Sequence, residues 1–211
     1  MSARAPEAAM LLRPGPAAPR ARIGPNAITR VAQALELRHG RETAARVFAR
    51  AGLAGHLADP PTHMVPEDDV TALAHALRDT LPPDAAVEVA REAGRTTADY
   101  LLARRIPRPV QAVLRVLPAA LAARVLVGAI ARHAWTFAGS GEFAARWGRQ
   151  LELSVRGNPM CRGLRTDAPA CDYYAATFER LFRALVQRDA RVAEIECEAA
   201  GGTACRFSVR W

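Results

Sequence analysis

The chain has 211 residues, half of them hydrophobic, which is enough for one domain with a substantial core. All 29 basic residues are arginines, and against 21 acidic residues they leave a net charge of +8. The arginines are scattered over every segment, and the longest run is Arg104-Arg105. Because nucleic-acid-binding proteins gather their basic residues into a patch or motif, we expect no nucleic-acid partner.

Residues 1–22 are rich in alanine, proline and arginine, and we expect a disordered tail there. Helical patterns begin at Asn26 and continue over 41–52, from Pro66 onward, over 84–105 and over 110–137, with a bend at Pro118. The most apolar stretch, 117–130, has about 14 residues and contains Arg124, whereas a membrane span needs about 20. We therefore expect a helical part over 23–138 that does not cross a membrane.

The pattern changes after Gly139-Ser140-Gly141. Alternation predicts short strands within 142–156, amphipathic spacing predicts a helix over 172–187, and two further strands are predicted over 191–198 and 203–211. Gly201-Gly202 is the expected turn between the last two strands. The segment 139–211 is therefore predicted to mix strands with one helix.

Two-residue periodicity divides the final hairpin into two faces. One face, which we expect to meet the core, holds Ala193, Ile195, Cys197, Cys205 and Phe207. The other face is expected to meet solvent, with Glu196 across from Arg206. A regular strand would point Glu194 away from the cysteines, and only a bulge or a local twist brings it back.

Three of the four cysteines form a spaced set with one glutamate: Cys171, Glu194, Cys197 and Cys205. Thiolates with one carboxylate or water suit a closed tetrahedral zinc site, and the hairpin would place Cys197 opposite Cys205. Two plainer interpretations stay open, namely small buried hydrophobic side chains and a disulfide between the opposed pair. The fourth cysteine, Cys161, can substitute for one of the others.

The chain resembles the vinyl-4-reductase family of small-molecule-binding domains in four segments: NPMCRG at 158–163, CDYY at 171–174, EIEC at 194–197 and CRF at 205–207. The resemblance implies an α+β fold, with an N-terminal helical layer followed by an antiparallel sheet and one crossing helix, similar to ligand-binding subunits of vesicle-tethering complexes. We expect 23–138 and 139–211 to form one domain. In phenol-sensing relatives three cysteines and a glutamate hold zinc, which implies a structural zinc on Cys171, Glu194, Cys197 and Cys205.

The resemblance also implies a role in bacteriochlorophyll synthesis, where reduction of a vinyl group of divinyl chlorophyllide is one candidate activity. A reductase needs a bound hydride source. The only nucleotide-like string, Gly139 to Ala144, lacks the preceding strand and following helix of a dinucleotide fingerprint, so we interpret it as a helix-to-strand turn. We therefore expect an accessory protein that binds a porphyrin or chlorophyllide and has no catalytic residues. A vinyl reductase and a small-molecule sensor domain are the alternatives.

The apolar segment 110–130 offers a surface on which a flat macrocycle can bury. We expect four residues to contact it: His133 on a central magnesium or a propionate, Trp135 on the ring, and Arg124 and Arg132 on propionates. The plainer interpretations are a core helix, a helix-end histidine and solvated arginines. Expected protein partners are magnesium chelatase or another pathway enzyme, and a homodimer stays open. We expect a cytoplasmic protein with at most peripheral contact at the photosynthetic membrane.

Overall fold

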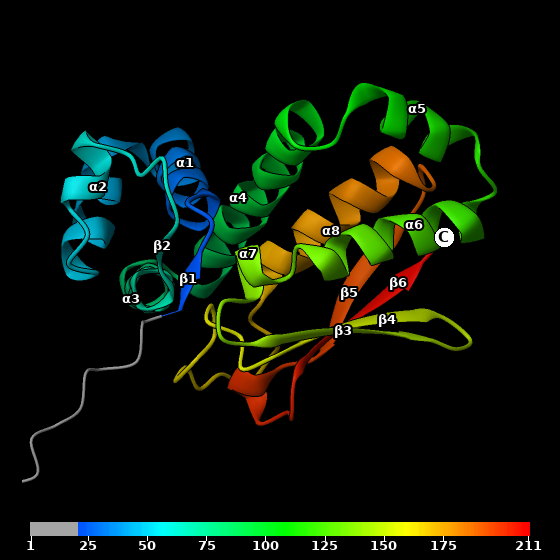
Figure 1. Ribbon diagram of the computed structural model, residues 1–211. Coiled ribbons are helices and arrows are strands. Elements are labelled where there is room, and N and C mark those ends of the chain that lie inside the picture. Colours follow the sequence, from blue (N-terminus) through cyan, green and yellow to red (C-terminus); the bar gives the residue numbers. More distant parts are fainter. Residues whose placement is uncertain (1–20) are drawn as a thin grey trace, which may run out of the picture.

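The computed structural model describes residues 21–211 (Figure 1). Its helices are α1 (Asn26–Arg50), α2 (Gly55–Ala58), α3 (Glu67–Thr80), α4 (Pro83–Arg104), α5 (Arg108–Val116), α6 (Ala119–Arg132), α7 (Trp135–Ala138) and α8 (Asp172–Leu185). Its strands are β1 (Arg22–Ile23), β2 (Val65–Pro66), β3 (Glu142–Trp147), β4 (Leu151–Arg156), β5 (Arg191–Glu196) and β6 (Cys205–Arg210), and a 3-10 turn, η1, spans Glu198–Ala200.

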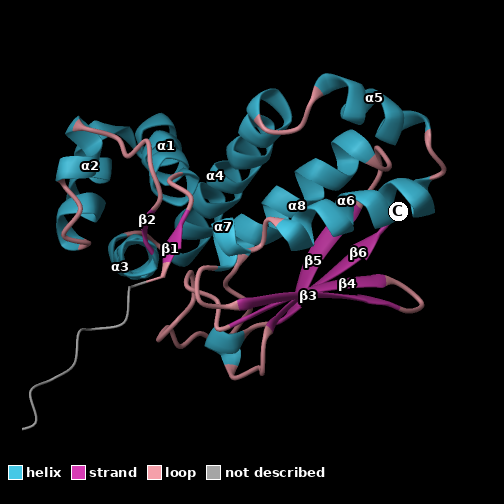
Figure 2. Ribbon diagram, in the orientation of Figure 1, coloured by secondary structure: helices cyan, strands magenta, loops and turns pink. Residues whose placement is uncertain are grey.

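The predicted α+β fold is confirmed. The last four strands form one antiparallel sheet in the order β3-β4-β6-β5, and β1 pairs with β2 in a separate two-stranded ladder. Figure 2 shows α8 and α6 on the same side of the four-stranded sheet, with the first helices farther along the molecule. No helix within 21–211 is long and apolar enough to cross a membrane.

Prolines set the helix boundaries that the sequence predicted. Pro107 and Pro118 adopt extended backbone immediately before α5 and α6, with ψ angles of 138° and 136°, and split the apolar segment into two helices. The first two predicted helices instead run together as α1, which kinks at Gly40, where φ is 78°. Glycine tolerates this left-handed value, so the helix changes direction there without a connecting loop.

Helices α4 and α8 hold the helical part against the sheet part. Gly94 of α4 lies where any Cβ would collide with the Tyr173 carbonyl oxygen of α8. Thr97 Oγ1 and Tyr173 OH are 2.8 Å apart, and Thr177 Oγ1 donates to the Gly94 carbonyl oxygen at 3.1 Å. One hydrophobic cluster therefore continues from the N-terminal helices through α8 to the sheet.

Two sequence predictions need adjustment. Of the predicted tail, residues 1–20 lie outside the described residues, and Arg22 pairs with Pro66 between β1 and β2. The predicted core face of the hairpin is wrong before Cys197, because a β-bulge lies between Glu194 and Glu196. Ile195 is therefore 51% exposed, while the pairing of Glu196 with Arg206 is confirmed.

Candidate functional site

Four cysteine side chains meet at the junction of the sheet and α8. They come from the loop after β4 (Cys161), the start of α8 (Cys171), the end of β5 (Cys197) and the start of β6 (Cys205). Each is at most 1% exposed, and all four are free thiols. The chain thus brings together donors that lie up to 44 residues apart in sequence.

The spacing of the four sulfurs suits a metal ion. Cys205 Sγ lies 3.3 Å from Cys171 Sγ, 3.4 Å from Cys161 Sγ and 3.9 Å from Cys197 Sγ, and Cys171 Sγ lies 3.8 Å from Cys197 Sγ. A tetrahedron with zinc–sulfur bonds of about 2.3 Å has edges of about 3.8 Å. The four cysteines can therefore hold a metal ion with little rearrangement.

Glu194 lies beside this cluster because the bulge turns it inward, opposite the buried Phe207. Its Oε2 accepts a hydrogen bond from the Cys171 backbone N–H at 2.7 Å. Its Oε1 is buried without a hydrogen-bond partner in the described part of the chain. Burial, with the nearby Cys197 thiol, raises the pKa of Glu194 to about 9, against the opposing hydrogen bond from Cys171. An unpartnered carboxylate oxygen next to several sulfurs fits the neighbourhood of a cation.

The thiols differ in acidity because they share hydrogen bonds in a dry site. Hydrogen bonds from Cys161 and Cys171 lower the pKa of Cys197, and the same two thiols lower the pKa of Cys205. Against an opposing hydrogen bond with Cys171, the hydrogen bonds with Cys197 and Cys205 and burial raise the pKa of Cys161. Hydrogen bonds with the other three cysteines and burial raise the pKa of Cys171. A bound divalent cation would favour the thiolate form of all four, as metal ligation requires.

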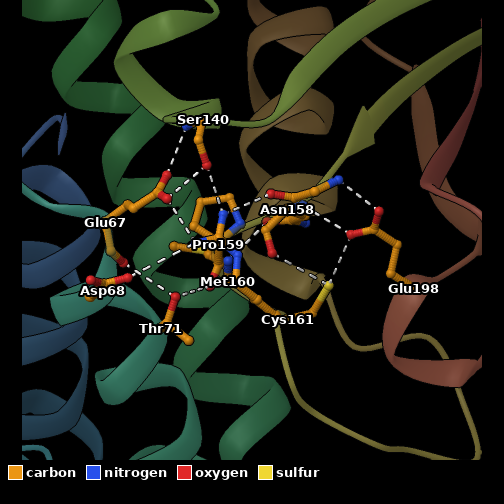
Figure 3. Close-up of polar contacts among 11 residues, drawn as sticks. Glu67, Asp68, Thr71, Ser140, Asn158, Pro159, Met160, Cys161 and Glu198 are labelled. Carbon is orange, nitrogen blue, oxygen red and sulfur yellow. Dashed lines mark hydrogen bonds and ion pairs between the residues drawn. The ribbon is translucent and has the colours of Figure 1, made fainter. Parts of the chain in front are cut away.

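A second set of hydrogen bonds positions the sulfurs. Asn158, which is fully buried, donates from Nδ2 to Cys171 Sγ at 3.1 Å and accepts from the Met160 N–H at 2.9 Å. The Glu198 carboxylate accepts from the backbone N–H groups of Gly157 and Asn158, at 2.7 and 2.9 Å (Figure 3). These contacts fix the loop that carries Cys161, in the manner of the outer partners of metal ligands.

The opposite side of the same loop is tied to α3 by a buried carboxylate. Glu67 is 6% exposed and accepts hydrogen bonds from Arg162 at 2.7 Å and from the N–H and hydroxyl of Ser140 at 2.8 and 2.7 Å (Figure 3). Burial opposes ionisation, yet Arg162 and Ser140 together lower the pKa of Glu67. Thr71 adds a 2.6 Å bond to the Pro159 carbonyl oxygen.

Sequence reasoning missed Asn158 and Glu67 as site residues. Asn158 appears in the sequence only as part of an Asn-Pro loop, and Glu67 only as one of three acids in the first turn of a helix. The partners of Glu67 lie 73 and 95 residues away, so no local spacing marks it. An Asn-Pro pair three residues before a cysteine is the one signal that the sequence offered.

The four predicted tetrapyrrole contacts lie on the outer side of α6 and α7. Arg124 is exposed and its guanidinium lies 5.5 Å above the centre of the Trp147 ring of β3. Arg132 and His133 are exposed at the end of α6, and Trp135 is 61% exposed at the start of α7. The structure thus brings Arg124 to Trp147, and places the other three toward the opposite end of the helix.

The predicted apolar surface divides into a buried half and an exposed half. Leu126, Val127 and Ile130 belong to the core, whereas Leu121 and Val125 are 50% and 49% exposed. Two hollows lie elsewhere: a cavity of about 40 Å³ lined in part by Cys171 and an open groove of about 480 Å³ between the end of α1 and α3. The exposure of Leu121 and Val125 makes the outer side of α6 an open surface.

The turn at Gly139-Ser140-Gly141 matches its prediction. It connects α7 to β3, and Gly139 adopts φ of 59°. A helix precedes it and a strand follows, which is the reverse of the order in a dinucleotide-binding motif. Its role here is structural, because the Ser140 N–H and hydroxyl bind Glu67.

Comparison with known proteins places this geometry in a family. The V4R domain model matches residues 151–211, which include all four cysteines. The chain is 47% identical over 188 residues to the bacteriochlorophyll synthase 23 kDa chain of Cereibacter sphaeroides, covering 89% of this chain and 90% of that protein. It is 40% identical over 194 residues to the chain of the same name from Rhodobacter capsulatus, covering 92% and 89%. The protein belongs to the family of bacteriochlorophyll synthase 23 kDa chains, with a V4R domain at its C-terminal end.

Solved structures extend the likeness to the fold. An H-NOX protein from K. algicida superposes with a TM-score of 0.60 at 11% identity, covering 89% of this chain and 96% of the other. A second H-NOX structure, solved to probe the function of heme distortion, gives 0.56 at 12% identity and covers 90% and 95%. At these identities the comparison shows a shared α+β architecture for this V4R protein.

Proposed function

We propose that this protein is a tetrapyrrole-binding accessory protein of bacteriochlorophyll synthesis that carries a structural zinc ion. The observation that carries the proposal is the near full-length relationship to proteins named as chains of bacteriochlorophyll synthase. The H-NOX neighbours support it, because one of them was solved to study heme, which is itself a tetrapyrrole. The protein would present its ligand to a pathway enzyme, with magnesium chelatase as the first candidate.

The outer side of α6 has the chemistry that a flat anionic macrocycle needs. Gly128 faces open space, and the half-exposed Leu121 and Val125 lie on the same helix. A ring laid here would bury apolar surface, and Arg124 can pair with a propionate while it stays against Trp147. Arg132 offers a second cation farther along the helix.

His133 is suited to bind the central metal of such a ring. Its Nδ1 lies 2.9 Å from the Ala129 carbonyl oxygen, which can only accept a hydrogen bond. The Nδ1 atom therefore carries the proton, and in the neutral ring Nε2 keeps its lone pair. Histidine ligands are commonly oriented by such a bond to a backbone carbonyl. Trp135, two residues on, is exposed and can stack on the macrocycle.

For the zinc site we propose Cys171, Cys197 and Cys205 as three of the ligands. The family resemblance implies Glu194 as the fourth, whereas the sulfur spacing favours Cys161, which we adopt. Glu194 would then act on the metal indirectly, through its bond to the Cys171 backbone. Four protein ligands leave no open position for a substrate, so the metal would stabilise the fold rather than take part in chemistry.

Elemental analysis and cobalt substitution test the metal proposal. Protein purified without added metal should contain one zinc per chain. Cobalt(II) should give the charge-transfer absorption of four thiolates, reduced in Cys161→Ser and kept in Glu194→Gln. The reverse result would return Glu194 to the ligand set. Absence of zinc, with four titratable thiols and unchanged stability in chelator, would show that the proposed metal site does not exist.

Absorbance titration tests the tetrapyrrole proposal. Magnesium or metal-free porphyrin should shift its Soret band on binding with a dissociation constant of about 1 μM, or about −8 kcal/mol. Incubation of divinyl chlorophyllide with the pure protein and NADPH, followed by chromatography, should give no monovinyl product. Catalytic turnover would establish a vinyl reductase instead. If the protein shifts the spectrum of no porphyrin, both the carrier and the reductase assignments would be wrong.

A further inference from the structure

The region from Tyr100 to Gly141 contains no acidic residue, although acidic residues occur throughout the rest of the chain from Glu36 onward. It covers α5, α6, α7 and their connections. Its six arginines are Arg104, Arg105, Arg108, Arg115, Arg124 and Arg132, and all six are exposed. None of them has a carboxylate partner among residues 21–211. The positive charge of this surface is therefore not neutralised by the protein itself.

Apolar side chains project from the same surface. On α5, Val110 is 42% exposed, Val113 56% and Val116 83%, while Gln111 and Leu114 face inward. Leu121 and Val125 on α6 lie beyond this set and belong to the proposed tetrapyrrole surface. Full burial of a valine is worth about 1.5–3 kcal/mol, so exposure of three valines on one short helix gives up a sizeable free energy.

The position of α5 leaves this surface accessible. Figure 1 shows α5 at the far end of α4, on the opposite side of the molecule from α2. Its inward contacts are to α8 and α6, and Arg115 anchors it by donating to the Ala184 carbonyl oxygen at 3.2 Å. The remaining faces of α5 carry the valines and Arg108 to the exterior.

We infer that α5, with Arg104 and Arg105 in the segment that precedes it, forms a docking surface for an anionic lipid bilayer. A helix with arginines around exposed apolar side chains is the arrangement that lies in a membrane interface. The arginines would pair with lipid phosphates, and the valines would enter the boundary between headgroups and acyl chains. The absence of carboxylates over these 42 residues favours an anionic surface over a protein partner, whose surface would normally mix both charges.

Vesicle flotation of the full chain tests this inference with two variants and two matched controls. Val113→Asp/Val116→Asp removes the apolar contact, and Arg105→Glu/Arg108→Glu reverses two charges. The controls place the same number of charge changes on α1, where Leu37 is 77% exposed and Ala45, Arg41 and Arg46 are exposed: Leu37→Asp/Ala45→Asp and Arg41→Glu/Arg46→Glu. Circular dichroism and thermal melting of each variant exclude misfolding as the cause of any loss.

We expect the protein to float with vesicles containing phosphatidylglycerol and not with pure phosphatidylcholine, and to be released by salt. Both the valine and the arginine variant should bind at least about tenfold more weakly, and both controls should bind like the parent. Equal binding to the two vesicle types, or equal losses in variants and controls, would overturn the inference. So would a dimer in light scattering that Val113→Asp/Val116→Asp converts to a monomer, because α5 would then face a second copy. The porphyrin titration is independent of these outcomes.

Discussion

The cysteine cluster and the outer surface of α5 and α6 differ in how their reactive and charged side chains are exposed to solvent. The cluster is buried, and the outer surface is open. At the cluster every sulfur is at most 1% exposed, and Asn158, Glu194 and Glu198 fix its surroundings. On the outer surface, Val116 is 83% exposed and its arginines have no carboxylate partners within 21–211. The first arrangement stabilises the fold, and the second leaves free energy available for binding.

The contrast predicts that substitutions at the cluster change stability and that substitutions on the outer surface change binding. A buried region held together by hydrogen bonds loses folding free energy when one partner is removed. A region whose groups face water loses little. The following measurements test this division, from the largest expected effect to the smallest.

Cys205→Ser should give the largest loss of stability. Cys205 has a sulfur contact with each of the other three cysteines, so its replacement would abolish metal binding, which in such sites is a large part of the folding free energy. We expect the melting temperature to fall by roughly 10 °C or more, together with loss of zinc. Trp147→Leu on the outer surface serves as the control. A Cys205→Ser protein that melts like the parent would break the comparison.

Cys161→Ser should resemble Cys197→Ser. In the sequence Cys161 lies outside the predicted set of Cys171, Glu194, Cys197 and Cys205, but the structure buries it within the cluster. Calorimetry of both variants, with zinc content, measures the difference. A loss of stability and zinc in Cys197→Ser but not in Cys161→Ser would show that Cys161 lies in the cluster without binding the metal.

Glu67→Gln should destabilise the protein by about 2–3 kcal/mol, because Arg162 and Ser140 would lose their charged partner in a buried site. Asp68→Asn, next in sequence with a side chain 63% exposed, is the matched control and should cost less than about 1 kcal/mol. Urea unfolding followed by circular dichroism measures both.

The Glu67 carboxylate also predicts an acid dependence. Its pKa is lowered in the folded protein from the ordinary value of 4.5, so its contribution is present above that pH and is lost as the pH falls through the folded-state pKa. The parent should therefore lose stability on acidification more steeply than Glu67→Gln. Parallel acid curves for the two proteins would contradict the assigned role of the carboxylate.

Val192→Ala and Ile195→Ala should differ in the direction opposite to the simple alternation pattern. Val192 is 5% exposed and its truncation should cost about 2 kcal/mol, whereas the half-exposed Ile195 should cost less than about 1 kcal/mol. Equilibrium unfolding of the two single variants reads out the bulge directly. A larger loss of stability in Ile195→Ala than in Val192→Ala would indicate a regular strand without the bulge.

Arg124→Ala should have the smallest effect on stability, less than about 1 kcal/mol from its contact with Trp147. Porphyrin affinity should nevertheless fall about fivefold, because an exposed ion pair is worth about 1 kcal/mol. Arg41→Ala on α1 is the control for net charge. Unchanged porphyrin affinity in Arg124→Ala would move the tetrapyrrole away from this side of α6.

The sequence by itself determined most of the elements and identified three of the four cysteines that cluster. Prolines and glycines mark helix ends through their backbone angles, so α4 and α8 were predicted close to their observed limits, and the bend predicted at Pro118 is the break between α5 and α6. Cys171, Cys197 and Cys205 were found because a spacing across one helix start and one hairpin can be read locally. These signals act within a few residues and do not depend on packing.

Only the tertiary structure decided which residues join across long separations. Cys161 reaches Cys205 over 44 residues and Glu67 reaches Arg162 over 95, and nothing in either segment specifies the other. The bulge at Ile195 shifts the strand register and turns Glu194 toward the sulfurs, which periodicity alone would have forbidden. Likewise, the sequence made 110–130 predominantly apolar, and packing on α8 and the sheet decided which of these apolar residues became core. Burial is a property of the assembled surfaces, so a single helix cannot determine which of its apolar residues will be covered.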